Sequence, residues 1–213
     1  MPDFLKMMMK HRKLIEEYKN KKSDIQKRLH EFKEAGKGSA KDIFSELCFC
    51  LLTPQSNARR CDKAIEELKK KRLLFKAPAA MIRPILKGRS RFHNKKTVYL
   101  VSARRSFDRS VLSGGDILDV RKKIVENIKG VGYKEASHFL RNIGLGRDIA
   151  ILDRHILKNL KRYGVIKTVP SSISVKSYLN IEESARLFAK KIGLGLEELD
   201  LLFWSRETGE IFK

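Results

Sequence analysis

The sequence has little cysteine, and its few cysteines form no metal-binding or disulfide pattern. Only three of the 213 residues are cysteines, Cys48, Cys50 and Cys61, an odd number confined to one quarter of the chain. No second cysteine pair or nearby histidine completes the spacing of a zinc site. The pattern excludes a scaffold built on disulfides and predicts a reduced intracellular protein without a metal site.

Long apolar runs are also missing. No stretch approaches the ~20 apolar residues of a membrane-spanning helix. The opening residues MPDFLKMMMKHRK lack the apolar core of a secretion signal. We therefore expect a cytoplasmic protein with no membrane partner. Met7, Met8 and Met9 are alternative starting residues.

Acidic residues are scarce relative to basic ones. The chain has 47 Lys and Arg against 25 Asp and Glu, which gives a formal net charge of +22. Such an excess favours a polyanionic partner, with nucleic acid as the first candidate. A lysine-rich solvated surface would also account for it. Because the basic residues run along the whole chain, the pattern predicts a folded domain with a basic face.

Apolar residues recur mostly at helical spacing, so we predict one all-α body. There is no internal repeat, low-complexity tract or long linker, and only TVPSSISV, at 168–175, suggests an extended segment. The first helix is expected to break near Asn20–Ser23. The helices are expected at roughly 8–34, 40–52, 57–75, 78–87, 94–107, 116–128, 134–143, 153–163, 181–192 and 196–206.

The stretch IKGVGYKEASHFL, 128–140, predicts a tight glycine turn between two helices. Glycine adopts positive φ and lets the backbone approach a ligand closely. The amides of Gly130 and Gly132, with those that begin the next helix, would form a phosphate site. The hairpin Lys129, Gly130, Val131 and Gly132 is therefore a candidate DNA-binding segment, and a turn without a ligand is the alternative.

Lys134 follows the hairpin, at the start of the second helix. An exposed lysine there opposes the helix dipole, at a cost of ~0.3–1 kcal/mol. A solvated lysine would tolerate this cost, so a surface role stays open. The other interpretation is a nucleophilic amine, which must be deprotonated to react and therefore needs a largely buried setting.

Asp153, nineteen residues after Lys134, follows the apolar stretch AIL and precedes RHILKNLKRYG. It is predicted to cap a helix that Gly164 ends. As a cap alone it would contribute about 1 kcal/mol. A carboxylate at a helix start that opens into a cleft could also stabilise a sugar cation as a base departs.

The motifs KGVGYK and ILDRHI together resemble the helix-hairpin-helix (HhH-GPD) DNA glycosylase superfamily. Upstream, LLTPQSNARRCDKAIEEL (51–68) and SRFHNKK (90–96) are similar to two other DNA-facing segments of its endonuclease III branch. The resemblance covers about Phe44 to Tyr163. The short chain and its final Lys213 look most like the type-2 8-oxoguanine DNA glycosylase/AP lyases of archaea and some bacteria.

This resemblance implies two helical subdomains that flank a DNA-binding cleft, one from about 58 to 150 and one from 1–57 plus 151–213. It implies a monomer that acts on double-stranded DNA containing 8-oxoguanine. DNA binding would associate this monomer with the nucleoid. No cofactor is expected, because no cysteine follows Cys61 to form the cluster of the iron–sulfur members.

The same resemblance implies the chemistry of two residues. Lys134 is the expected nucleophile, which attacks C1′, releases the damaged base and forms a Schiff base. β-Elimination of the 3′ phosphate follows, as part of base excision repair. Asp153 is the expected essential carboxylate.

Further DNA and base contacts are also implied. Gln55, with Ser56 and Asn57, is expected to enter the space left by the flipped nucleotide, and Phe92 to act as a wedge. Trp204 is expected to form a wall of the base pocket. The carboxylate of Lys213 is the expected acceptor for the N7 proton that distinguishes 8-oxoguanine from guanine. From the residues alone, alternatives remain: Gln55 could lie in a turn that ends a helix, Phe92 and Trp204 could be core residues, and Lys213 could be a frayed last residue.

Two other functions stay open. One is an endonuclease III-like glycosylase/lyase for pyrimidine lesions. The other is a noncatalytic helix-hairpin-helix DNA-binding module, for which the glycine hairpin and the positive charge suffice.

Overall fold

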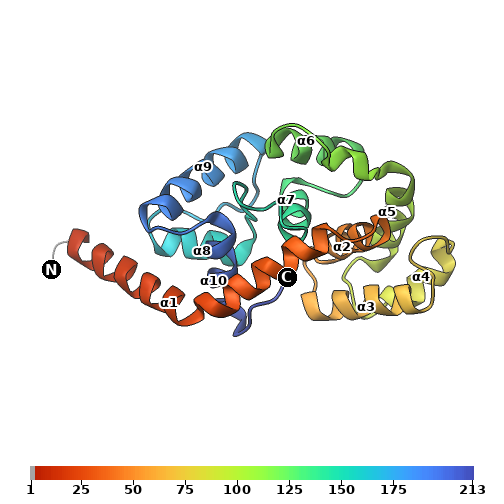
Figure 1. Cartoon of the computed structure of the whole chain (residues 1–213), viewed down its shortest axis with the longest axis horizontal. Coiled ribbons are helices and arrows are strands. Elements are labelled where there is room, and N and C mark those ends of the chain that lie inside the picture. Colours follow the sequence, from red (N-terminus) through yellow and green to blue (C-terminus); the bar gives the residue numbers. More distant parts are fainter. Residues whose placement is uncertain (1–2) are drawn as a thin grey trace. The chain divides into compact units, whose positions relative to one another are not determined.

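The computed structural model describes residues 3–213, and all the regular structure in that range is helical, as predicted (Figure 1). The 3-10 helix η1 covers Arg109–Leu112. The α-helices are α1 Asp3–Gly36, α2 Ala40–Leu52, α3 Ala58–Lys70, α4 Ala79–Leu86, α5 His93–Ser106, α6 Ile117–Asn127, α7 Tyr133–Asn142, α8 Arg154–Arg162, α9 Val175–Lys191 and α10 Leu196–Thr208. None of these helices combines the length and apolarity needed to cross a membrane.

The predicted break in the first helix is wrong. α1 runs without interruption through Asn20–Ser23. Leu14, Tyr18 and Ile25 are buried at helical spacing on either side of this polar stretch. The polar residues therefore mark a solvated turn of a continuous helix, not the end of one.

The segment TVPSSISV, suggested to be extended, forms no strand within residues 3–213, although its Ser174 has an extended backbone. Its last residues begin a helix. The Ser174 hydroxyl accepts a hydrogen bond from the Ser177 amide at 3.2 Å, and α9 starts at Val175, six residues earlier than expected. A serine cap therefore defines the boundary that apolar spacing missed.

Contacts divide the chain into two compact units. Unit 1 comprises residues up to Lys33 together with Gly146–Lys213, and unit 2 comprises Glu34–Leu145. These boundaries differ from the expected ones near 57 and 150. The reason for the first difference is that α2 packs against α3, α5 and α7, all within unit 2.

Unit 2 is organised around the apolar α2. Nine of the residues of α2 are buried. Cys48, Cys50 and, on α3, Cys61 are unbridged thiols with no exposed surface. Burial raises the pKa of the Cys48 and Cys61 thiols. The cysteines are thus part of the core.

Unit 1 packs α10 against α8 and α9. Arg206 of α10 lies at the centre of a polar network. Its guanidinium donates to the Tyr163 hydroxyl at 2.6 Å and to Asn159 Oδ1 at 3.1 Å, and it forms an ion pair with Glu17 of α1. The Tyr163 ring stacks on Phe203, with centroids 5.6 Å apart. This network fixes α8, the helix that Asp153 caps.

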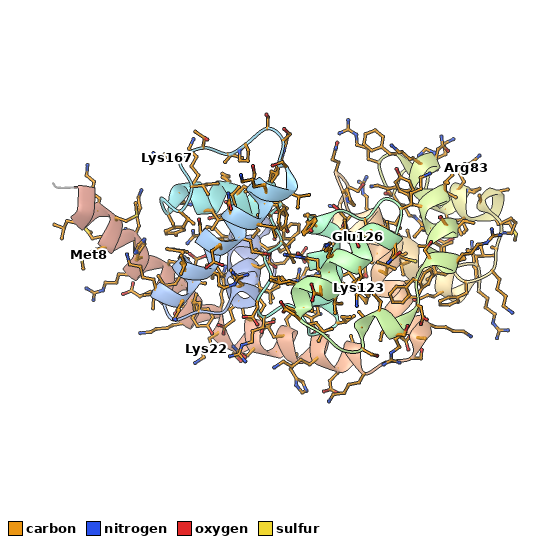
Figure 2. The ribbon with its side chains drawn as sticks, turned by 90° about the horizontal axis from the view of Figure 1, so that it is seen from above. Met8, Lys22, Arg83, Lys123, Glu126 and Lys167 are labelled. Carbon is orange, nitrogen blue, oxygen red and sulfur yellow. The ribbon has the colours of Figure 1, made fainter. Side chains whose placement is uncertain are left out.

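Basic side chains cover the surfaces of both units. Figure 2 shows Lys22 on α1, Lys123 on α6 and Lys167 after α8, and all three are exposed. The surfaces of both folded units therefore carry part of the positive charge that the sequence indicated.

Candidate active site

The predicted glycine hairpin is confirmed between α6 and α7. Gly130 has φ of 90°, which favours glycine. A Cβ there would lie 2.7 Å from Tyr99 Cγ and closer still to other atoms of that ring. The Val131 amide donates to the Ile128 carbonyl at 3.1 Å, and both side chains are buried. The turn is thus anchored from inside while Lys129 and Gly130 remain exposed.

Gly132 caps the start of α7, and its amide donates to Glu135 Oε2 at 3.1 Å. The other amides of the first helical turn have no acceptor within the helix. They lie beside the exposed glycine turn, where the helix dipole also favours an anion. The hairpin therefore has the local geometry of a phosphate-binding site.

Lys134 is the second residue of α7 and is largely enclosed by protein. Its side chain is 23% exposed, and its Nζ lies 3.9 Å from Glu135 Oε1. A freely solvated surface lysine would be more exposed. The structure thus keeps this amine next to the hairpin and mostly out of bulk water.

Asp153 belongs to unit 1 and caps α8 as predicted, accepting the Ile156 amide on Oδ1 at 2.8 Å. Gly164 ends the same helix with φ of 72°. The four residues before Asp153, 149–152, are all buried. The Asp153 carboxylate therefore directly follows a buried, apolar segment, residues 149–152.

Two residues that the sequence did not reveal hold the 149–152 segment in place. The Tyr178 hydroxyl donates to the Ala150 carbonyl at 2.6 Å and accepts from the Leu152 amide at 3.3 Å. Glu182, 2% exposed, accepts the Ala150 amide at 2.7 Å. Only their i, i+4 spacing on one helix could have suggested a shared role, and that spacing is common in packed helices.

Gln55 and Phe92 lie at the exposed tips of two loops in unit 2, α2–α3 and α4–α5. Both have left-handed backbones, with φ of 53° and 57°, which is unusual for residues other than glycine. Phe92 is 53% exposed, and the Arg91 guanidinium lies 4.9 Å from its ring centroid. An exposed aromatic ring on a strained loop is available for contact with a partner.

Ser56 and Asn57 have structural partners already. Ser56 Oγ accepts the Arg91 amide at 2.9 Å, which joins the two loops. Asn57 caps α3 by accepting the Arg60 amide at 3.0 Å. The structure therefore brings Gln55, Ser56 and Phe92 into one connected pair of loops.

A third residue missed from the sequence, Lys96, lies beneath these loops and is 4% exposed. Burial, together with the nearby charge of Lys134, lowers the pKa of Lys96 to about 8. A lysine in the run HNKK indicates a surface position, so no sequence signal pointed to its burial.

Trp204 and Lys213 belong to unit 1. The Trp204 ring is half-buried and meets His155 edge-on, with centroids 5.2 Å apart. Its indole N–H has no hydrogen-bond partner among the described residues. Lys213 is half-buried and follows Phe212, which is 3% exposed. The last residues are therefore packed against the protein.

No group of three or more His, Cys, Asp or Glu side chains within the described part of the chain is arranged to hold a metal ion. The chemistry available in residues 3–213 is that of an enclosed amine, a capping carboxylate and basic surfaces with exposed loops.

A glycine hairpin between two helices, with a largely enclosed lysine two residues after it and basic surfaces around it, defines the helix-hairpin-helix class of DNA-binding proteins. The family described as 8-oxoguanine DNA glycosylase matches residues 25–194. The chain belongs to this family.

Relatives support this membership over nearly the whole chain. The 8-oxoguanine DNA glycosylase/AP lyase of Fusobacterium nucleatum is 43% identical over 209 residues, covering 92% of this chain and 94% of the relative. The Methanocaldococcus jannaschii 8-oxoguanine glycosylase/lyase, solved with a 15mer DNA containing 8-oxoguanine, is 40% identical with a TM-score of 0.87, covering 94% and 98%. The Thermotoga maritima 8-oxoguanine DNA glycosylase is 34% identical with a TM-score of 0.89, covering 97% and 100%.

Proposed function

We propose that this protein is a bifunctional DNA glycosylase/AP lyase that excises 8-oxoguanine from double-stranded DNA and then cleaves 3′ to the abasic site. The observation that carries the proposal is the enclosed Lys134 amine directly after the glycine hairpin. The relatives from Fusobacterium nucleatum and Methanocaldococcus jannaschii, both 8-oxoguanine DNA glycosylase/AP lyases, support the same substrate and both reactions.

The hairpin binds the DNA backbone. Backbone amides at the exposed Gly130 and at the start of α7 donate hydrogen bonds to a phosphate, while the basic surfaces attract the duplex over longer distances. This grip is independent of base sequence, because it uses only the backbone. It delivers the sugar of the damaged nucleotide to the lysine that follows the hairpin.

The first chemical step breaks the bond between base and sugar. After loss of its proton, Lys134 Nζ forms a bond to C1′ while the glycosidic bond breaks, and the electron pair of that bond leaves with the base, which is then protonated. Asp153 stabilises the positive charge that develops on the sugar. Its Oδ1 is held by the Ile156 amide, so the carboxylate keeps a fixed orientation.

The second step cuts the strand. Opening of the sugar ring converts the lysine adduct into a Schiff base, which acidifies the protons on C2′. Loss of one C2′ proton and departure of the 3′ phosphate complete β-elimination. Water then hydrolyses the Schiff base and returns Lys134 to the free amine, so the protein is regenerated.

Base recognition is assigned to unit 1. Trp204 supplies an aromatic wall with an unsatisfied N–H. The carboxylate of Lys213 accepts a hydrogen bond from the N7–H group of 8-oxoguanine, which guanine lacks. Packing of the buried Phe212 keeps the neighbouring Lys213 ordered.

Borohydride trapping tests the proposal. The wild-type protein should form a covalent complex with an 8-oxoguanine duplex, and Lys134→Gln should form none. Lys123→Gln is the matched control, because it removes the same charge from an exposed position on α6 and should trap normally (Figure 2). Trapping by Lys134→Gln would refute the assignment of the nucleophile.

A panel of substrates separates the alternatives. Faster cleavage of a thymine-glycol duplex than of an 8-oxoguanine duplex would instead support a pyrimidine-lesion enzyme. Full retention of function in Lys134→Arg would support a noncatalytic DNA-binding module.

A further inference from the structure

Lys96 makes an unusual set of contacts for a buried lysine. Its Nζ donates to the carbonyl oxygens of Leu52 and Pro54, each at 2.7 Å. It also lies 3.0 Å from Ser56 Oγ and 3.1 Å from Ser90 Oγ. All four acceptors are neutral, and they outnumber the three hydrogens of an ammonium group. The buried charge is therefore fully hydrogen-bonded.

These acceptors come from the two loops that carry Gln55 and Phe92. Pro54 and Ser56 stand on either side of Gln55, and Ser90 lies two residues before Phe92. Ser90 Oγ also lies 2.9 Å from the Leu52 carbonyl oxygen. The Lys96 ammonium group thus connects the α2–α3 loop on either side of Gln55 with Ser90 in the α4–α5 loop.

The loop tips need such support. A residue other than glycine in the left-handed region is strained, and it persists only when its surroundings determine it. Gln55 and Phe92 account for two of the three such residues among the described part of the chain. Both are exposed, so burial of their own side chains does not hold the backbone in this conformation. The Lys96 hydrogen bonds act on their neighbours instead.

A core-filling role does not explain this arrangement. An apolar side chain of similar length, such as methionine, would fill the same space without the cost of burying a charge. It would leave the Leu52 and Pro54 carbonyls without the donor that joins them. The position therefore favours a group that fixes the loops over one that only packs.

Resting on the proposed function, we propose that Lys96 is a positioning residue. It holds Gln55 and Phe92 in the conformation in which they enter the duplex when the damaged nucleotide leaves the base stack. Lys96 does not touch the reacting atoms and acts only through the two loops. Extrusion of a nucleotide costs a few kcal/mol, and preformed wedges reduce the ordering that must accompany it.

The test measures displacement of the opposite base, independently of the chemical step. A duplex carries a tetrahydrofuran abasic analogue, and 2-aminopurine stands opposite it. The proteins carry Lys134→Gln, so no reaction intervenes. Entry of the loops into the stack raises 2-aminopurine fluorescence at saturating protein, and a titration gives Kd separately.

Lys96→Met should lower the displacement equilibrium about tenfold while changing Kd for the duplex less than about threefold. Phe92→Ala is the reference for loss of the wedge. Lys123→Met is the matched control, because it removes the same charge from an exposed position on α6, outside the two loops, and should displace the base normally. Equal losses in displacement and in Kd would indicate general misfolding and overturn the proposal, as would a normal signal from Lys96→Met.

Ser56→Ala keeps the test decisive if Lys96→Met fails to fold. It removes one acceptor of Lys96 and the acceptor of the Arg91 amide, so displacement should fall without loss of helical circular dichroism. An unchanged signal from folded Ser56→Ala would also overturn the proposal. Excision of 8-oxoguanine by the wild type is assayed in parallel. Absence of excision refutes the proposed function alone, because the displacement assay contains no lesion base.

Discussion

Replacement of Gly130 by alanine separates two demands that the hairpin makes on this position. With φ of 90°, an L-residue is strained by roughly 1–2 kcal/mol. The added Cβ would also overlap the Tyr99 ring, and overpacking of this kind costs about 1–3 kcal/mol. Gly130→Ala should therefore destabilise the protein by about 2–5 kcal/mol, or roughly 4–20 °C in Tm for a chain of this size.

Urea denaturation followed by circular dichroism measures the loss, and Gly88 provides the matched control. Gly88 has φ of 74°, lies in the same unit, and has open space where an added Cβ would stand, with no neighbouring atom within 4 Å. Gly88→Ala should lower the free energy of unfolding only by the cost of backbone strain, about 1–2 kcal/mol. Adding Tyr99→Ala to Gly130→Ala should relieve the steric share, seen as a coupling energy in a double-mutant cycle. Equal losses for the two glycine variants would refute the close approach of Tyr99.

Three further predictions concern single side chains. Asp153→Asn should keep the bond to the Ile156 amide and lose less than about 0.5 kcal/mol of stability, whereas Asp153→Ala should lose about 1 kcal/mol; both should lose excision, and an active Asp153→Asn would exclude a role for its charge. Deletion of Lys213 should reduce discrimination of 8-oxoguanine from guanine more than duplex binding, while Lys213→Ala, which keeps a terminal carboxylate, should discriminate; equal losses in discrimination and binding would argue against a base contact. The pKa of Lys96 is about 8 in the folded protein, against an ordinary value of 10.5, so between these pH values the unfolded state holds a proton that the folded state has lost. The free energy of unfolding, measured relative to Lys96→Met, should therefore rise by ~3 kcal/mol from pH 8 to 10.5. A difference that does not change with pH would mean that Lys96 titrates normally.

Local signals explain what the sequence could predict. The hairpin is encoded by two glycines between two apolar periodicities, and the cap at Asp153 by a carboxylate before a helix that ends in glycine. Both features depend on residues within one or two turns of each other. The family motifs lie on these same local elements, so fold class and family followed from them.

Contacts between distant segments explain what the sequence could not predict. Lys96 bonds to carbonyls more than forty residues earlier, and a lysine beside another lysine carries no mark of burial. Tyr178 supports Ala150 across 28 residues. The left-handed backbone at Gln55 is a product of such contacts, because glutamine has no preference for it. The break expected in α1 failed for a related reason, since burial of Tyr18 and Ile25 overrides the polarity of the residues between them.

The buried thiols have a consequence for the conditions under which the protein works. Oxidants attack the thiolate form of accessible cysteines. Cys48, Cys50 and Cys61 have no exposed surface, and burial keeps Cys48 and Cys61 protonated by raising their pKa. Peroxide that converts guanine to its oxidised form would therefore find no ready target in the core of unit 2. The fold thus keeps these three thiols away from the oxidants that create the damage.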